Sequence, residues 1–197
     1  MTASSARRLA HGIWLGTGLV WLVALILAIT SLPSEAASVA LLGIPIAIYS
    51  SVGAMIARRR PENPIGWLFG GVGLALALWM LGLGYAEALE SLPGATAAAW
   101  MAVLIYTTLL PMALPAFLLL FPDGRLRSPR WGVALWSVAL GGVLLLVGSI
   151  GQIDGFGQVP VSPPDWTTAI PAAESIYIAG LLVTFAASLA GFVALVL

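Results

Sequence analysis

The chain contains six apolar segments, each long enough to cross a lipid bilayer as a helix. Crossing the bilayer core takes about 20 helical residues, and 60% of the 197 residues are hydrophobic while only 8% are charged. The segments are predicted at about 13–31, 37–57, 65–86, 97–121, 131–150 and 175–197. We therefore expect an all-α fold, a polytopic membrane helix bundle of six transmembrane helices that forms a single integral membrane domain over residues 1–197.

Arginine is confined to one predicted side of this bundle. Three consecutive arginines, Arg58 to Arg60, follow the second segment, and each would cost about 2.5 to 3.5 kcal/mol at the bilayer centre. With a cytoplasmic N-terminus, all eight arginines of the chain lie on the cytoplasmic side, joined there by two acids, Glu62 and Asp123. The positive-inside rule therefore predicts that the N-terminus and the C-terminus are both cytoplasmic.

The first apolar segment follows a short basic stretch, an arrangement that also occurs in signal peptides. The segment is about 19 residues long, however, and residues 34–37 (S-E-A-A) form only a weak cleavage site. We therefore expect a retained transmembrane helix.

The residues of the common catalytic and metal sites are missing from the sequence. The chain has no cysteine and one histidine, His11, and it contains neither an H-E-x-x-H nor a G-x-S-x-G motif. We assign His11 to a basic cytoplasmic cap beside Arg7 and Arg8. We predict no catalytic residue, no metal and no cofactor for this chain, and no nucleic acid as a partner.

Two prolines in the fourth segment, Pro111 and Pro115, are expected to bend it. Three residues with hydroxyl groups stand just before Pro111, namely Tyr106, Thr107 and Thr108. Such hydroxyls can bond the backbone carbonyls that a proline leaves free. Two interpretations stay open: a repaired kink, or a hinge or pocket within the bundle.

Candidate sensing residues lie at the predicted outer ends of the segments. Acidic or basic residues at mid-membrane depth are typical of carriers and pumps, and here the nearest candidate, Glu87, is expected to be interfacial. The connection over 151–174 is longer than usual, and we expect either a functional loop or a proline-stiffened cap. The candidate outer-face residues are Tyr85, Glu87, Glu90, Asp154, Asp165 and Trp166.

Two connections on the predicted cytoplasmic side share a design. Each contains arginines and prolines and is followed by a tryptophan, and Asn63 and Ser128 are predicted to cap the helices that begin there. The resulting cytoplasmic basic face consists of Arg58, Arg59, Arg60, Arg125, Arg127 and Arg130. We expect this face to bind anionic lipid headgroups or to dock a cytoplasmic kinase region or partner protein.

Pairs of small residues four apart allow helices to approach closely in lipid. Three such pairs are Gly12 and Gly16, Gly66 and Gly70, and Ala187 and Gly191. A homodimer is left open as a partner, and no dimer face is assigned.

Two stretches of the sequence resemble a known family. Residues 59–69 read R-R-P-E-N-P-I-G-W-L-F, and residues 118–131 read L-L-L-F-P-D-G-R-L-R-S-P-R-W. Together they resemble the N-terminal membrane region of sensor histidine kinases from actinobacteria and related bacteria, and of related uncharacterised membrane proteins. The resemblance covers essentially the whole chain.

The resemblance implies a sensory or regulatory input module of a two-component system in the bacterial inner membrane. It also implies a cytoplasmic output domain, with a kinase region, that is absent from this chain, so the chain is expected to be non-catalytic by itself. The alternative is a small membrane carrier or an accessory subunit of a transport complex, with Glu87 and the bent fourth segment lining a path.

Overall fold

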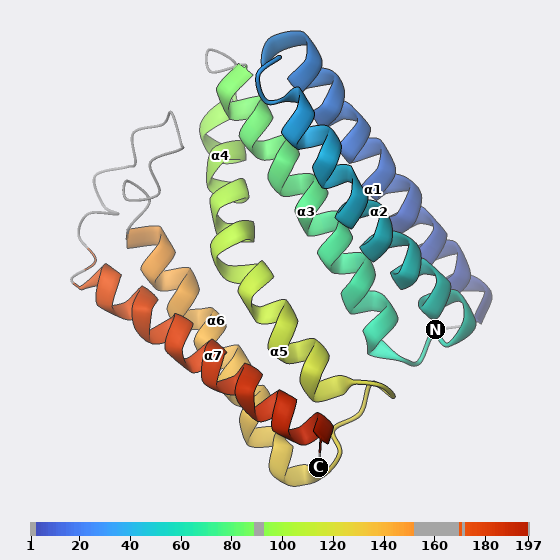
Figure 1. Ribbon diagram of the computed structural model, residues 1–197, viewed down its shortest axis with the longest axis vertical. Coiled ribbons are helices and arrows are strands. Elements are labelled where there is room, and N and C mark those ends of the chain that lie inside the picture. The colour runs from blue at the N-terminus through green and yellow to red at the C-terminus, as the bar shows by residue number, and fades with distance from the viewer. Residues whose placement is uncertain (1–2, 89–92, 152–169, 171, 197) are drawn as a thin grey trace. The chain divides into compact units, whose positions relative to one another are not determined.

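The computed structural model of the chain describes residues 3–88, 93–151, 170 and 172–196, and within them it forms helices and no strands (Figure 1). The elements are α1 (Ala3–Ser31), α2 (Ala36–Arg59), α3 (Pro64–Ala88), α4 (Ala95–Leu104), the π-helix η1 (Ile105–Leu109), α5 (Leu110–Leu120), the 3₁₀-helix η2 (Pro129–Trp131), α6 (Gly132–Gly151) and α7 (Ala173–Val196). Six helical segments are long and apolar enough to cross a membrane, and α4, η1 and α5 together make the fourth. The predicted all-α fold is confirmed, and the chain is a multi-pass membrane protein.

The first helix begins much earlier than predicted. The other five segments start and end within two residues of their predicted bounds, whereas α1 starts at Ala3 instead of near Ile13. The cause is that hydropathy marks where the apolar run begins, while residues 3–10 (A-S-S-A-R-R-L-A) contain no glycine or proline that would stop a helix. Arg7, Arg8 and His11 therefore lie on α1 itself.

The helices carry large apolar side chains outward and small residues inward. Among the exposed side chains are Leu19, Ile29, Leu41, Trp136, Leu182 and Phe185. Among the buried residues are Ala28, Ser50, Ala77, Ala99, Ser149 and Thr184. A water-soluble monomer rarely exposes so much apolar surface, whereas helices in lipid pack through their small residues.

The chain divides into two compact units, residues 1–102 and 103–197, and each is described separately. The expectation of one membrane domain over the whole chain stays a prediction.

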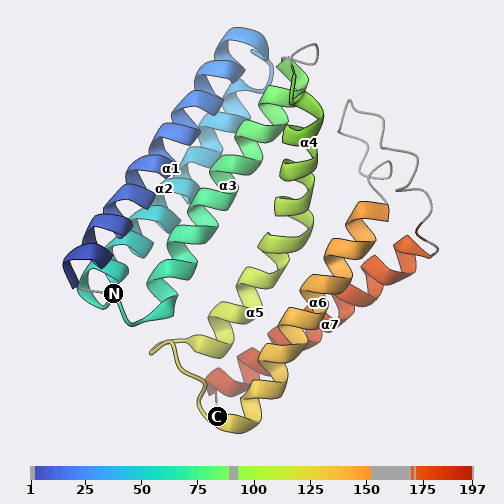
Figure 2. The ribbon, with the colours of Figure 1, turned by 180° about the vertical axis from the view of Figure 1, so that it is seen from behind.

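In the first unit, α1, α2 and α3 pack against one another, and the two opposite views in Figures 1 and 2 show them side by side. The contact between α2 and α3 depends on residues without side chains: a Cβ added to Gly53 would lie 2.8 Å from the carbonyl oxygen of Gly66. Gly66 thus takes part in close helix approach, as predicted for it. A Cβ added to Gly12 or Gly16 would meet nothing within 4 Å, so the described structure does not use that pair for packing.

The connection between α2 and α3 has the predicted capping geometry. Asn63 Oδ1 accepts a hydrogen bond from the backbone N–H of Ile65 at 3.0 Å, and Pro64 is the first residue of α3. Trp67 Nε1 donates to the carbonyl oxygen of Pro61 at 2.9 Å. The capping prediction for Asn63 is confirmed.

In the second unit, α5, α6 and α7 pack around Leu119, Val138 and Ala187. A Cβ added to Gly191 would lie 2.7 Å from Leu118 Cβ, so Gly191 marks the close contact between α7 and α5. Small residues thus mediate helix contacts in this unit as well.

The prediction that Ser128 caps a helix with its side chain is wrong. Ser128 stands before η2, but its side chain makes no capping hydrogen bond. The backbone N–H of Trp131, which such a cap would bond, already donates to the backbone carbonyl of Ser128 at 3.1 Å. The single 3₁₀ turn therefore satisfies this donor through the backbone.

Candidate functional site

A turn of π-helix, η1, interrupts the fourth span immediately before Pro111. The backbone N–H of Leu110 bonds the carbonyl of Ile105, five residues back, in place of the four-residue bond of an α-helix. Proline lacks an N–H and its ring crowds the carbonyl four residues back, which here belongs to Thr107. The wider turn gives that carbonyl more room, so the sequence position of η1 follows from Pro111.

Buried hydroxyl groups join η1 to α6. Thr107 Oγ1 donates to the carbonyl oxygen of Val103 at 2.7 Å and accepts from Ser149 Oγ at 2.8 Å, and the two side chains are only 2% and 0% exposed. Thr108 Oγ1 is also buried, and it has no hydrogen-bond partner in the part of the chain that the structure describes. We call Thr107, Thr108 and Ser149 the hydroxyl cluster.

The structure places the predicted hinge residues in different environments. The hydroxyl of Thr107 bonds the backbone carbonyl of Val103. The carbonyl that the Pro111 ring crowds is the backbone carbonyl of Thr107 itself, and this hydroxyl does not bond it. Tyr106 is 52% exposed, while Pro115 is fully buried in α5. Ser149 was missed because nothing in the sequence indicates that a residue 42 positions further along the chain meets Thr107.

We expect Ser149→Ala to lower the free energy of unfolding by about 1 kcal/mol, because hydrogen bonds between membrane helices contribute about 0.6 to 1.7 kcal/mol. The measurement is unfolding of the detergent-solubilised protein by SDS titration, followed by circular dichroism. The matched control is Ser137→Ala on the same helix, since the Ser137 hydroxyl donates within its own helix, to the carbonyl oxygen of Val133 at 3.0 Å. Equal losses in the two variants would contradict a stabilising Thr107–Ser149 bond.

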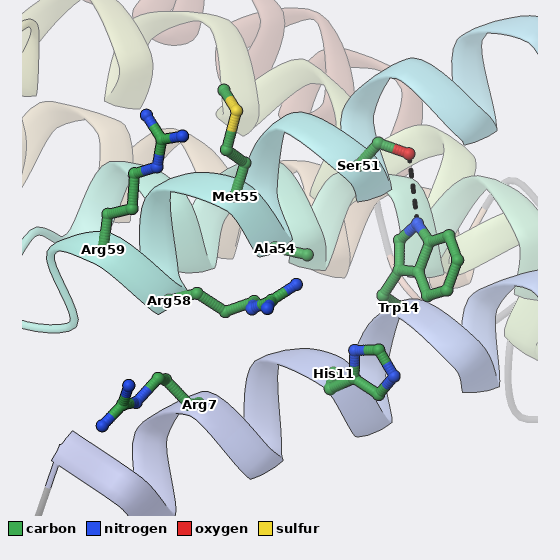
Figure 3. A pocket seen from close by; sticks show the side chains of 8 residues that line it. All are labelled: Arg7, His11, Trp14, Ser51, Ala54, Met55, Arg58 and Arg59. Atoms are coloured by element: carbon green, nitrogen blue, oxygen red, sulfur yellow. Dashed lines mark hydrogen bonds between the residues drawn. The ribbon is translucent and has the colours of Figure 1, made fainter.

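A second site is a pocket between α1 and α2, within the first unit (Figure 3). Its volume is about 520 Å³, and it is lined by Arg7, His11, Trp14, Ser51, Ala54, Met55, Arg58 and Arg59. We call this the α1–α2 pocket. Trp14 Nε1 donates to Ser51 Oγ at 3.1 Å across it, and the rings of His11 and Trp14 lie 5.7 Å apart.

The α1–α2 pocket exists because α1 extends through the basic N-terminal stretch. Arg7, His11 and Trp14 are spaced by four and three residues, which places them on one face of a helix. That spacing was the sequence signal for the pocket, but it is informative only if the helix reaches back to Arg7. Figure 3 shows Arg58 and Arg59 on α2, toward the end of the pocket where Arg7 of α1 lies.

The remaining arginines of the predicted basic face have other surroundings. Arg60 follows the last residue of α2 and does not line the α1–α2 pocket. In the second unit, Arg127 Nη1 donates to the carbonyl oxygen of Ala194 in the last described turn of α7 at 2.8 Å. Arg125 and Arg130 are exposed. That all six arginines share one face stays a prediction.

Two of the predicted outer-face residues are described by the structure. Tyr85 donates its hydroxyl to the carbonyl oxygen of Pro93 at 3.2 Å, so it links the end of α3 to the connection before α4. Glu87 is exposed in the last turn of α3. Glu90, Asp154, Asp165 and Trp166 lie outside the described residues.

The described part of the chain holds no group of three His, Cys, Asp or Glu side chains that could bind a metal ion. In comparisons with known proteins, no family model, no curated protein and no solved structure matches the chain. The features that bear on function are therefore the hydroxyl cluster, the α1–α2 pocket, and residues 59–69 and 118–131.

Proposed function

We propose that this protein is a membrane-embedded sensory or regulatory input module that is non-catalytic by itself. In this proposal it lies in the bacterial cytoplasmic membrane with its arginines inside, and it passes a signal through helix rearrangement to a cytoplasmic output region of the histidine-kinase type. The orientation is supported by the placement of all eight arginines in predicted cytoplasmic segments. The output type is supported only by the resemblance of residues 59–69 and 118–131.

The observation that carries the proposal is the π-helical turn beside the hydroxyl cluster. A relay needs an element with two discrete arrangements. Conversion of η1 to an α-helical turn would shift the register by one residue, which rotates the following helix by about 100° and moves it by about 1.5 Å. The Thr107–Ser149 hydrogen bond stabilises the arrangement seen here, so a signal that disrupts this bond would favour the other.

The structure supports the alternative, a membrane carrier, less well than it supports a sensory module. That alternative required Glu87 to line a path, and Glu87 is exposed at the end of α3. The first span has no Asp, Glu, Arg, Lys or His after residue 11, and the centres of the other five spans have none either. The sequence therefore offers no such side chain at mid-membrane depth to couple transport to an ion.

We expect Pro111→Ala to change both the geometry of the second unit and its signalling output. Alanine restores a backbone N–H and removes the ring, so it favours an α-helical turn at η1. Because the chain has no cysteine, spin labels on cysteines introduced at Leu114 and Leu182 would be unique. We expect Pro111→Ala to shift the distance distribution between these two labels.

The same variant is assayed for ATP-dependent phosphotransfer in membrane vesicles that contain the protein with its output region. We expect a change of about fivefold or more, the lower end of common allosteric couplings. Pro45→Ala is the matched control, since Pro45 lies inside the continuous helix α2. Unchanged label distances would overturn the hinge, and vesicles without any phosphotransfer would overturn the kinase-type output.

A further inference from the structure

The α1–α2 pocket concentrates positive charge. Three of its eight lining residues are arginines, one is His11, and none is acidic. Arginine keeps its charge at every physiological pH. The side chains of Arg58 and Arg59 have no ion pair and no hydrogen bond with any residue that the structure describes. An anion in this pocket would therefore meet the guanidinium groups of Arg58 and Arg59, which are not bonded to an acid among the described residues.

The pocket has the size and the mixed walls of a ligand site. Sites for small molecules commonly measure about 300 to 1,000 Å³, and this pocket measures about 520 Å³. Trp14, Ala54 and Met55 supply apolar wall, and Ser51 contributes a hydroxyl that is already held by Trp14. Figure 3 shows the three arginines toward one end of the pocket, and His11, Trp14 and Ser51 toward the other end.

The exposed surface next to the pocket is apolar. On the following turns toward the middle of the spans, Leu15 and Leu19 of α1 are 54% and 63% exposed, and Ile44 and Ile48 of α2 are 57% and 56% exposed. These side chains match the acyl chains of a lipid, whereas the arginines match its headgroup. Guanidinium groups can bind phosphate oxygens through paired hydrogen bonds.

We propose that the α1–α2 pocket binds a phosphate-bearing anion, and specifically the headgroup phosphate of an anionic phospholipid with its acyl chains along Leu15 and Ile48. Arg58, Arg59 and Arg7 hold the phosphate, and Trp14 marks the boundary between headgroup and acyl chains. The site lies entirely within the first unit, so it does not depend on the signalling role proposed above. The protein then binds one lipid tightly in addition to its general lipid annulus.

The test is native mass spectrometry of the full chain in a non-ionic detergent, titrated with dioleoylphosphatidylglycerol. The informative variant is the double substitution Arg58→Ala and Arg59→Ala. The matched control is Arg8→Ala with Arg60→Ala, which removes the same charge from neighbouring positions outside the lining. We expect the first variant to bind the lipid about 25-fold more weakly, since each of the two arginines contributes about fivefold near an anionic lipid. We expect a change of less than about threefold in the control.

Two further arms identify the ligand. Dioleoylphosphatidylcholine carries the same acyl chains on a headgroup without net charge, and we expect it to bind about tenfold more weakly than the anionic lipid. Inorganic phosphate is added as a competitor: no displacement supports a lipid, while displacement that requires Arg58 and Arg59 supports a soluble phosphate compound in the same site.

Equal weakening in the two double variants would overturn the proposal, because it would show diffuse attraction to a basic surface. Binding of neither the anionic lipid nor inorganic phosphate would overturn it as well, and would favour an acidic protein partner. Thermal unfolding followed by circular dichroism confirms that both variants are folded before binding is compared.

Discussion

Replacing Gly53 with valine is expected to lower the free energy of unfolding of the detergent-solubilised protein by about 3 kcal/mol. A Cβ at this position would lie 2.8 Å from both the carbonyl oxygen of Gly66 and the Cα of Gly70. These are backbone atoms of α3, so no side-chain rotation can make room and α2 must move away. In lipid, helix association depends on such close packing because there is little hydrophobic driving force between helices. The measurement is SDS titration followed by circular dichroism.

The control for Gly53→Val is Gly71→Val on the facing helix. A Cβ at Gly71 would meet nothing within 4 Å, so the substitution is expected to change the free energy of unfolding by less than about 0.5 kcal/mol. The two variants add the same side chain to a helical glycine in the same unit. If both lost stability equally, the α2–α3 contact seen in the structure would not be what stabilises this unit.

Most of the fold could be predicted because the bilayer imposes a simple length rule. Apolar runs of about 20 residues, separated by arginines and prolines, gave the six spans. Pro64 and Asn63 also set the start of α3 in the way that their local chemistry dictates. These features depend on residues close together in the sequence, where periodicity and turn preferences apply directly.

The sites were harder to predict because they join residues far apart in the sequence. Pro111 and its neighbouring hydroxyls were identified, but the sequence could not show that Ser149 of α6 is the partner of Thr107. Similarly, the arginines of α2 were identified as basic surface, while the pocket also required α1 to be helical at Arg7 and to align His11 with that surface. Which helix faces pack together is decided by interlocking shapes, and a single sequence with many glycines and alanines is compatible with several.

Glycines illustrate the same limit. The pair Gly66 and Gly70 was recognised from spacing, but Gly53, which packs against it, was not. A Cβ added to either residue of the equally spaced pair Gly12 and Gly16 would meet no described atom within 4 Å. Spacing identifies a helix face that can approach another closely. It does not identify the partner.

Two glycines on α6 face different kinds of neighbouring atoms on the adjacent helices. A Cβ at Gly148 would lie 2.6 Å from the N, Cα and Cβ atoms of Tyr177 on α7, whereas a Cβ at Gly142 would meet the thioether end of Met112 on α5. A methionine side chain can rotate away, but a helix backbone cannot. We therefore expect Gly148→Ala to lower the free energy of unfolding by about 2 kcal/mol, and Gly142→Ala to change it by less than about 1 kcal/mol.

The same unfolding measurement serves for both α6 variants, and a second substitution tests the cause. Adding Tyr177→Ala to Gly148→Ala should not restore stability, because the three obstructing atoms, N, Cα and Cβ of residue 177, are all retained by alanine. Recovery in the double variant would show that the tyrosine side chain, and not the approach of the two helices, was the obstacle. A large loss in Gly142→Ala would instead show that Met112 is held rigidly between α5 and α6. The expected pattern is a stability that depends more on the approach of the α6 and α7 backbones than on the contact of Gly142 with Met112 of α5.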